Sequence, residues 1–384
     1  MNILFCLNTT FNPSNGGIAN VSLTIANGLE KKGHNCYYLS IYKNSESVSE
    51  KQYFLPQGTA NSDCAENKLW FSSFVRDKSI DVIINQNGTT PYSLWAVEWA
   101  RENNIKALTV YHSSLMGLYS FHKLRLNAKS ILKKIPDGIC RRLFRIKYGK
   151  YYRKQIELSD KVVTLSDKFF HELEWFSRTK IKDKCVAIPN AINNEQIRIE
   201  PKECEKRKEL LFVGRLSPEK QPDLLVRIWH TLSSKFPEWQ LTIVGDGILR
   251  SKIEKLIKNK SVERVSLEGY QEPWKYYQRA KILCMTSAFE GFGLVLAEAM
   301  SLGTVPIAFN SYANINDIVE NGVSGLLIEP FSKNKYAKGL SELMNNSAML
   351  DKMSVAAKEK AKCFSLSSVI KQWNDLLESL HNGH

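Results

Sequence analysis

Short apolar runs alternate with helical patterns along this chain, and the alternation stops once and then restarts. The apolar runs of the first half cover residues 2–8, 35–42, 81–87, 106–112 and 161–166. Those of the second half cover residues 210–217, 240–247, 264–270, 281–287 and 304–309. Strands that alternate with helices form βαβ units, which build parallel sheets. The pattern predicts an α/β protein with two doubly wound, Rossmann-like sheets.

A polar, highly charged stretch over residues 194–209 separates the two halves and is the predicted linker. The 384 residues exceed the size at which a single hydrophobic core stops growing. We therefore predict an N-terminal domain over residues 1–195 and a C-terminal domain over residues 205–364. The segment 365–380 has the pattern of one amphipathic helix, and the N-terminal domain is the candidate partner for its apolar face. Because such sheets bind ligands at the carboxyl ends of their strands, we expect a site in a central cleft that both domains face.

The segment 121–155 carries most of the excess positive charge. It holds twelve Lys or Arg against one acid, in a chain whose formal net charge is +14. Its basic residues alternate with Leu, Ile, Phe and Tyr at roughly helical spacing, which is typical of a surface that binds anionic lipid headgroups or other polyanions, although a solvated helix face is the alternative. The candidate contacts to an acceptor or an anionic membrane surface are Lys133, Lys134, Arg141, Arg142 and Arg145. Nucleic acid is disfavoured because no helix-turn-helix, zinc-finger spacing or RNP-like strand is present.

The segment EGFGLVLAEAM, residues 290–300, places two carboxylates at either end of a mostly apolar stretch. Glu290 lies in a turn after a buried strand, whereas Glu298 lies more than one turn into the following helix, so the two acids cannot form a close pair. Between them lie glycines and the free N–H groups of a helix start, which suit a phosphate. A phosphate site flanked by two carboxylates that bind hydroxyls is suited to a sugar nucleotide. The alternative is a helix-start acid at Glu290 and a solvated Glu298.

Two cations and a glycine turn follow other predicted strands of the second half. Arg215 and Lys220 come after the strand that turns at Gly214, and a cation pair there is suited to neutralising a diphosphate leaving group. Gly245 opens a G-x-G turn, but Arg250 occupies the place of the third glycine of a dinucleotide fingerprint. This departure disfavours a Rossmann oxidoreductase. What remains is a glycine turn that allows a ligand to approach the backbone closely.

Six segments then stand in a recognisable order and spacing. They are GGIANVSLTIANGLEKKGH, VAIPNAIN, FVGRLSPEK, IVGDGILR, EGFGLVLAEAMSLGTVPIA and IVENGVSGLLIEP. This series resembles the motifs of a family 4 retaining glycosyltransferase with the GT-B fold. The resemblance covers nearly the whole chain, and the E-x7-E segment is its most specific part. Thr286, Ala191 and Asn194 depart modestly from the family pattern.

The resemblance implies a role for each matching residue. The implied catalytic residues are Glu290, His112, Arg215 and Lys220. The implied donor-binding residues are Gly16, Gly17, Gly214, Arg215, Lys220, Gly245, Glu290, Gly291, Phe292, Gly293, Leu294 and Glu298. Glu290 would face the hydroxyls of the donor sugar, Glu298 those of the ribose. His112 and Ser166 match strand-end residues of the family cleft, and a satisfied structural histidine is the alternative for His112.

The resemblance also implies an activity. It is retaining transfer of a hexose from a UDP- or GDP-sugar to a lipid-diphosphate-linked saccharide, in assembly of a bacterial surface polysaccharide such as capsule or lipopolysaccharide. No metal or other cofactor is expected, since no Asp-x-Asp motif is apparent and the basic pair takes the place of a divalent cation. No apolar run reaches the ~20 residues of a membrane span, so we predict a cytoplasmic protein that is peripheral on the inner face of the membrane. A GT-B-fold nucleotide-sugar epimerase, a glycoside hydrolase and a non-catalytic binding protein are the alternatives.

Overall fold

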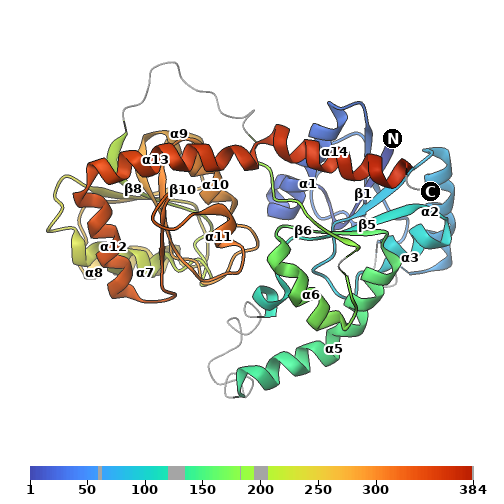
Figure 1. Ribbon diagram of the computed structural model, residues 1–384, viewed down its shortest axis with the longest axis horizontal. Helices are drawn as coiled ribbons and strands as arrows, with labels where there is room; N and C mark the ends of the chain where they lie inside the picture. Colours follow the sequence, from blue (N-terminus) through green and yellow to red (C-terminus); the bar gives the residue numbers. More distant parts are fainter. Residues whose placement is uncertain (59–62, 120–134, 182, 194–205, 383–384) are drawn as a thin grey trace. The chain divides into compact units, whose positions relative to one another are not determined.

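The computed structural model describes residues 1–384 with the exception of 59–62, 120–134, 182, 194–205 and 383–384. The chain divides into two compact units (Figure 1). Unit 1 comprises Met1–Ala191 together with Leu366–His384, and unit 2 comprises Ile192–Ser365. The C-terminal segment therefore belongs to unit 1. Within the described ranges, no helix is both long enough and apolar enough to cross a bilayer.

Unit 1 contains a parallel sheet of seven strands in the order β3-β2-β1-β4-β5-β6-β7. The strands are β1 (Asn2–Thr9), β2 (Asn35–Tyr42), β3 (Gln52–Phe54), β4 (Val82–Asn85), β5 (Lys106–Tyr111), β6 (Lys161–Thr164) and β7 (Cys185–Ala187). The chain moves outward from β1 in one direction and from β4 in the other, so these two strands flank the switch point of a doubly wound sheet. The edge strands β3 and β7 were not predicted, because runs of three residues carry too little pattern.

Helices cover both faces of this sheet. They are α1 (Gly17–Glu30), α2 (Ala65–Asp77), α3 (Trp95–Glu102), α5 (Asp137–Leu158), α6 (Phe170–Ser177) and α14 (Leu366–Asn382). Leu4 and Cys6 of β1 join an apolar cluster with α2 and α3, while Ile3 and Phe5, which alternate with them along the strand, are also fully buried. A strand that is apolar on both faces needs such a double cover.

Helix α14 packs against α1 within unit 1. A side chain added at Gly28 would overlap that of Ile370, so the two helices approach closely there. Nε2 of His34, just after α1, lies 2.8 Å from Oδ1 of Asn374. The apolar stripe of the C-terminal helix, which includes the buried Trp373, is thus covered by the first half of the chain.

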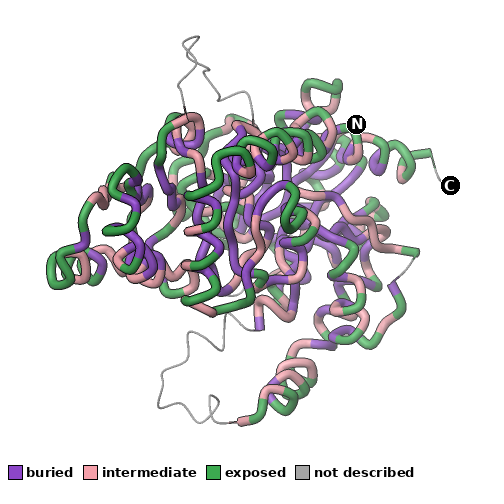
Figure 2. The backbone as a smooth tube through the Cα atoms, turned by 60° about the vertical axis from the view of Figure 1, so that its left-hand side comes forward, coloured by how far each residue is buried: buried purple, intermediate pink, exposed green. Residues whose placement is uncertain are grey.

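Unit 2 contains a parallel sheet of six strands in the order β10-β9-β8-β11-β12-β13. The strands are β8 (Arg207–Val213), β9 (Gln240–Val244), β10 (Val265–Gly269), β11 (Ala280–Met285), β12 (Val305–Phe309) and β13 (Leu326–Ile328). The helices are α7 (Pro222–Leu232), α8 (Arg250–Asn259), α9 (Trp274–Arg279), α10 (Leu294–Ser301), α11 (Ile315–Ile318), α12 (Lys333–Asn345) and α13 (Ser347–Ala361). The strands are largely buried, whereas the helices expose one side (Figure 2). The predicted α/β class with two Rossmann-like sheets is confirmed.

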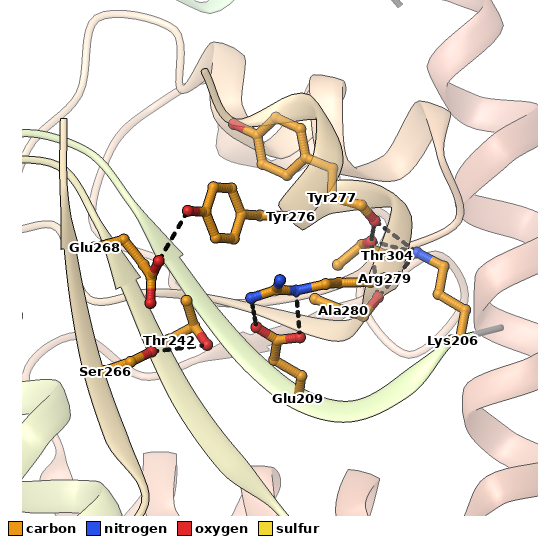
Figure 3. Close-up of polar contacts among 10 residues, drawn as sticks. All are labelled: Lys206, Glu209, Thr242, Ser266, Glu268, Tyr276, Tyr277, Arg279, Ala280 and Thr304. Atoms are coloured by element: carbon orange, nitrogen blue, oxygen red, sulfur yellow. Dashed lines mark hydrogen bonds and ion pairs between the residues drawn. The ribbon is translucent and has the colours of Figure 1, made fainter. Parts of the chain in front are cut away.

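Strand β8 begins at Arg207, inside the predicted linker 194–209. The prediction of a linker was therefore wrong for its last three residues. Glu209 is fully buried there, and its two carboxylate oxygens each accept a hydrogen bond of 2.9 Å from the guanidinium of Arg279 (Figure 3). A charged strand residue can be buried when a partner neutralises it, and that partner lies 70 positions away.

Lys206 closes the amino-terminal edge of the same sheet (Figure 3). Its ammonium donates hydrogen bonds to the backbone oxygens of Tyr277 (2.8 Å) and Ala280 (2.9 Å) and to Oγ1 of Thr304 (2.6 Å). Burial lowers the pKa of Lys206 to about 7. These contacts join the starts of β8, β11 and β12 at the edge opposite the predicted ligand site.

Candidate active site

Two loops meet at the carboxyl ends of β8 and β11 in unit 2. These strands are neighbours at the switch point of the sheet, where doubly wound folds bind ligands. Oγ1 of Thr286 donates to the backbone oxygens of Lys220 (3.1 Å) and Gln221 (3.0 Å). The N–H of Ala288 donates to the backbone oxygen of Glu219 at 2.7 Å. The loop after β11 is thereby fixed against the loop after β8.

Lys220 and Glu290 are brought into direct contact by these loops. Nζ of Lys220 lies 2.5 Å from Oε1 and 2.6 Å from Oε2 of Glu290. Oγ of Ser287, which the sequence did not single out, donates a further bond of 2.6 Å to Oε1. The Glu290 side chain is 10% exposed and that of Lys220 24%, so solvent screens their attraction only in part. An ammonium has three N–H donors, which leaves Lys220 capacity for an oxyanion beside the carboxylate.

The turn after β8 also approaches the turn after β9. The N–H of Gly214 donates to the backbone oxygen of Val244 at 3.0 Å. Gly245 has a φ of 134°, and a Cβ there would overlap the carbonyl oxygen of Gly214. Glycine is therefore required at 245 by conformation and by space. Arg215 is the residue after Gly214 and is exposed, so its guanidinium is accessible to a ligand.

Helix α10 starts beside Glu290. Gly293 is its N-cap residue with a φ of 84° and a ψ of 44°, a left-handed conformation that favours glycine. The backbone N–H groups of this turn belong to Gly291, Phe292, Gly293 and Leu294. N–H groups at a helix start have no partner within the helix and favour anions. The ring of Phe292 is buried against Phe364 at 5.6 Å, so Phe292 can offer a ligand its N–H rather than its ring.

Tyr312, in the loop after β12, was not predicted. A Cβ at Gly293 would overlap its hydroxyl, so the hydroxyl lies directly above the start of α10. This hydroxyl is buried and has no hydrogen-bond partner among the described residues. An unsatisfied buried hydroxyl is costly unless a water or a ligand meets it.

Glu298 lies within α10 and contacts α9. Its Oε2 accepts a hydrogen bond of 2.9 Å from the hydroxyl of Tyr277. Burial raises the pKa of Glu298 to about 7, while the bond from Tyr277 acts in the opposite direction. Tyr277 was not singled out from the sequence, since a tyrosine in a short helix such as WKYYQR resembles an ordinary packing residue.

In unit 1, His112 follows β5 and contacts Gln86, which follows β4. The distance between Nε2 of His112 and Oε1 of Gln86 is 2.6 Å. Burial lowers the pKa of His112 to about 4, so the imidazole is neutral near pH 7. Both residues lie at the carboxyl ends of neighbouring strands. Gln86 lies in a polar end of a predicted strand, DVIINQN, and that position was the only signal that could have identified it.

Gly16 and Gly17 lie in the loop after β1. Gly16 caps α1 with a φ of 116°, and Gly17 is the first residue of that helix. A Cβ at either position would meet nothing within 4 Å, so the conformation of Gly16, rather than crowding, favours glycine here. Ser166, after β6, accepts a hydrogen bond from the N–H of Lys168 at 3.1 Å and thus caps a short helical turn.

The basic segment is described only from residue 135 onward. Lys133 and Lys134 lie outside the described residues. Nε of Arg141 lies 2.5 Å from a carboxylate oxygen of Asp137, and the guanidinium of Arg145 lies 4.2 Å from the ring centroid of Trp175. Arg142 is exposed on α5. In the described part of the chain, no three His, Cys, Asp or Glu side chains are grouped as metal ligands would be.

Two family models match the chain, one in each half. The model of Glycosyltransferase Family 4 matches residues 15–196, and that of Glycosyl transferases group 1 matches residues 193–360. Together they span both sheets and the strand-end loops described above. Taken together, the two matches support a glycosyltransferase of the family 4 type, and the topology of the two sheets is that of the GT-B fold.

Individual relatives agree with this class. The chain is 28% identical over 371 residues to an uncharacterized glycosyltransferase of Haemophilus influenzae, a match that covers 95% of this chain and 97% of that one. It is 31% identical over 183 residues to the N-acetylgalactosamine-N,N'-diacetylbacillosaminyl-diphospho-undecaprenol 4-alpha-N-acetylgalactosaminyltransferase of Campylobacter jejuni, covering 47% of this chain and 48% of that one. The fold matches that of HepE from Anabaena, crystallised with UDP and glucose, with a TM-score of 0.73 at 15% identity, over 99% of this chain and 100% of that one.

Proposed function

We propose that the protein is a retaining hexosyltransferase that moves a sugar from a UDP- or GDP-sugar to a lipid-diphosphate-linked saccharide. Its place would be the inner face of the cytoplasmic membrane, in assembly of a bacterial surface polysaccharide such as capsule or lipopolysaccharide. The observation that carries this proposal is the contact between Lys220 and Glu290 at the switch point of unit 2, beside the start of α10. The name of the Campylobacter relative, which includes a diphospho-undecaprenol acceptor, supports the acceptor class.

Unit 2 is the donor domain in this proposal. The diphosphate is bound by the guanidinium of Arg215, by an N–H of Lys220 that Glu290 does not use, and by the backbone N–H groups at the start of α10. Glu290 accepts hydrogen bonds from hydroxyls of the donor sugar, and Glu298 from those of the ribose. The glycine turns at 214 and 245 allow the nucleotide to approach the backbone.

Unit 1 is the acceptor domain. Gly16 and Gly17, at the start of α1, contact the phosphates or the acceptor through their backbone. His112 contributes a neutral imidazole to the reacting sugar or the acceptor. The basic residues of α5 bind the anionic surface on which a lipid-linked acceptor is held.

The reaction needs charge stabilisation more than a nucleophile. The bond between the anomeric carbon and the diphosphate oxygen breaks, and the acceptor oxygen forms a bond to that carbon on the same face. The acceptor proton passes to the leaving diphosphate. Arg215 and Lys220 stabilise the charge that develops on this leaving group without a metal ion. Glu290 is held by Lys220 and Ser287, which lowers its reactivity as a nucleophile and favours direct front-face attack.

The test is nucleotide release from a panel of UDP- and GDP-sugars, with and without an undecaprenyl-diphosphate-linked saccharide. The proposal expects one donor to be consumed only with acceptor present, with loss of this activity in Glu290→Ala and retention in Glu342→Ala, an exposed carboxylate of α12. Isomerisation of a donor without acceptor would establish the epimerase instead. A trapped glycosyl-enzyme adduct would rule out the front-face route.

A further inference from the structure

The outer face of α5 carries large apolar side chains that are about half exposed or more. Ile139, Leu143 and Ile146 are 50%, 49% and 67% exposed. Their spacing of four and three residues places them on one side of the helix, and we call them the apolar stripe. The opposite side of α5 is anchored, because Tyr152 and Ile156 are buried in a cluster with α6. The stripe is therefore displayed on a helix whose orientation within unit 1 is fixed.

Exposed cations border this stripe. Arg142 and Lys147 lie on its two sides at ~100° per residue, and Lys150 continues its line one turn further. We call these three residues the basic border. Helix α5 as a whole holds seven Lys or Arg against two acids. Apolar side chains flanked by cations are the pattern of a helix that lies in the interface of an anionic bilayer.

Aromatic side chains with polar tips stand beside the helix. Tyr92 is 54% exposed, and its ring centroid lies 5.5 Å from that of Tyr148 and 4.6 Å from that of Tyr151. Trp175 of α6 is 37% exposed and lies against Arg145 of α5. At ~100° per residue, Tyr148 and Arg145 lie on the side of α5 that faces away from the apolar stripe, so these contacts help to fix the helix in place and do not belong to the stripe.

We propose that the apolar stripe inserts into the headgroup region of an anionic lipid bilayer, with the basic border on the lipid phosphates. Charge selects this occupant over a second copy of the chain, because two such basic helices would repel each other. The inference deepens the proposed function and rests on it for its purpose, since an inserted helix would hold the enzyme where a lipid-linked acceptor is anchored. Binding to the bilayer itself requires neither donor nor acceptor.

The test is co-sedimentation of the 384-residue protein with vesicles of phosphatidylglycerol and phosphatidylcholine, and with vesicles of phosphatidylcholine alone. The wild type should bind the anionic vesicles and keep part of this binding at ~1 M salt, because insertion of apolar groups is not screened. Replacing the basic border by Gln should weaken binding by about 100-fold. Replacing the apolar stripe by Ser should weaken it by at least about tenfold and abolish the salt-resistant part.

Matched controls separate these effects from general surface changes. Leu69, Val323 and Val355 are exposed apolar residues elsewhere, and their replacement by Ser should leave binding unchanged. The control for charge is replacement of three exposed lysines by Gln, which should also leave binding unchanged. They are Lys255, Lys258 and Lys260, in and after α8. Equal binding by the stripe variant and the wild type would overturn the proposal, as would a stripe variant that changes only the oligomeric mass in light scattering.

The outcomes also separate this inference from the proposed function. Transfer to a soluble acceptor analogue without any vesicle binding would remove the inference and keep the transferase. Vesicle binding by a protein that consumes no donor would remove the transferase and keep the inference.

Discussion

Oε1 of Gln86 lies 2.6 Å from Nε2 of His112, at the carboxyl ends of two neighbouring strands. With the Gln86 amide oriented so that its oxygen faces the ring, Nε2 is the donor and Nδ1 is the unprotonated nitrogen of the imidazole. We expect His112→Ala to lower kcat/KM by about 100-fold, and Gln86→Ala by less, since it releases the ring without removing it. Gln86→Ala should also change the pH profile, which a purely structural role would leave alone.

The lowered pKa of His112 also predicts how its folding contribution depends on pH. The folded state binds fewer protons than the unfolded chain between the folded pKa of about 4 and the ordinary 6.5. The free energy of unfolding therefore falls as pH decreases from 6.5 to 4, and His112→Asn should lack this fall. Titration of His112 by NMR with a midpoint near 6.5 would contradict the prediction.

Lys220 is predicted to act mainly on the leaving diphosphate. Lys220→Ala should lower kcat by roughly 100- to 1,000-fold, because a charge-stabilising donor in a partly buried site is removed. A double-mutant cycle with Glu290→Gln, read by nucleotide binding and by kcat, measures how far the two residues act as one unit. Additive losses would show that their contact has no functional coupling. Lys235→Ala, an exposed lysine after α7, is the control.

Glu298 makes nucleotide binding depend on pH. Its pKa of about 7 lies above the ordinary 4.5, and an ionised carboxylate is the better acceptor for ribose hydroxyls. Affinity for UDP or GDP should therefore rise as pH increases through about 7. Tyr277→Phe removes a hydrogen bond to the ionised form and should move this midpoint upward, as isothermal titration calorimetry can measure. An unchanged midpoint would exclude a role for the tyrosine in positioning Glu298.

The same shift affects stability in the opposite sense. The folded state holds an extra proton between pH 4.5 and about 7, so the free energy of unfolding falls as pH rises through this range, by at most about 3 kcal/mol. Glu298→Gln should not show the fall. Chemical denaturation of the two proteins at both ends of the range checks this.

Tyr312→Phe should have opposite effects on stability and on donor binding. Removing an unsatisfied buried hydroxyl should raise the free energy of unfolding by about 1 kcal/mol. If the hydroxyl meets the donor at the start of α10, the same change should weaken donor binding by about tenfold. A variant that is more stable and binds the donor equally well would show that the hydroxyl has no ligand role.

The pair of Glu209 and Arg279 is predicted to be structural. Arg279→Ala leaves a buried carboxylate without its partner and should cost about 3–5 kcal/mol. Because the pair lies at the amino-terminal edge of the sheet, kcat should be preserved below the melting temperature. The exposed pair of Lys208 and Glu238 is the control, where Glu238→Ala should have a much smaller effect on the free energy of unfolding because solvent screens the pair. Equal costs for the two variants would contradict the burial argument.

The alternation of apolar runs and helical patterns determined the class of fold and most of the strands. Periodicity is a local property, so it can be read wherever a run is long enough, as in β1 and β9. It could not identify β3, β7 and β13. Each of these edge strands has only three residues, and each is a strand only because a neighbouring strand pairs with it. It also treated residues 207–209 as linker, because burial of Glu209 depends on a partner from α9.

The site divides in the same way. Glycine turns, strand-end cations and the two acids of EGFGLVLAEAM could be predicted, since their residue types and local spacing already indicate a phosphate and hydroxyl ligand. The residues that these groups contact could not be predicted. Lys220 meets Glu290 across 70 positions and His112 meets Gln86 across 26, and these contacts form only when parallel strands align their carboxyl ends. The sequence alone determined which chemical groups stand at the strand ends, and the tertiary structure decided which of them touch.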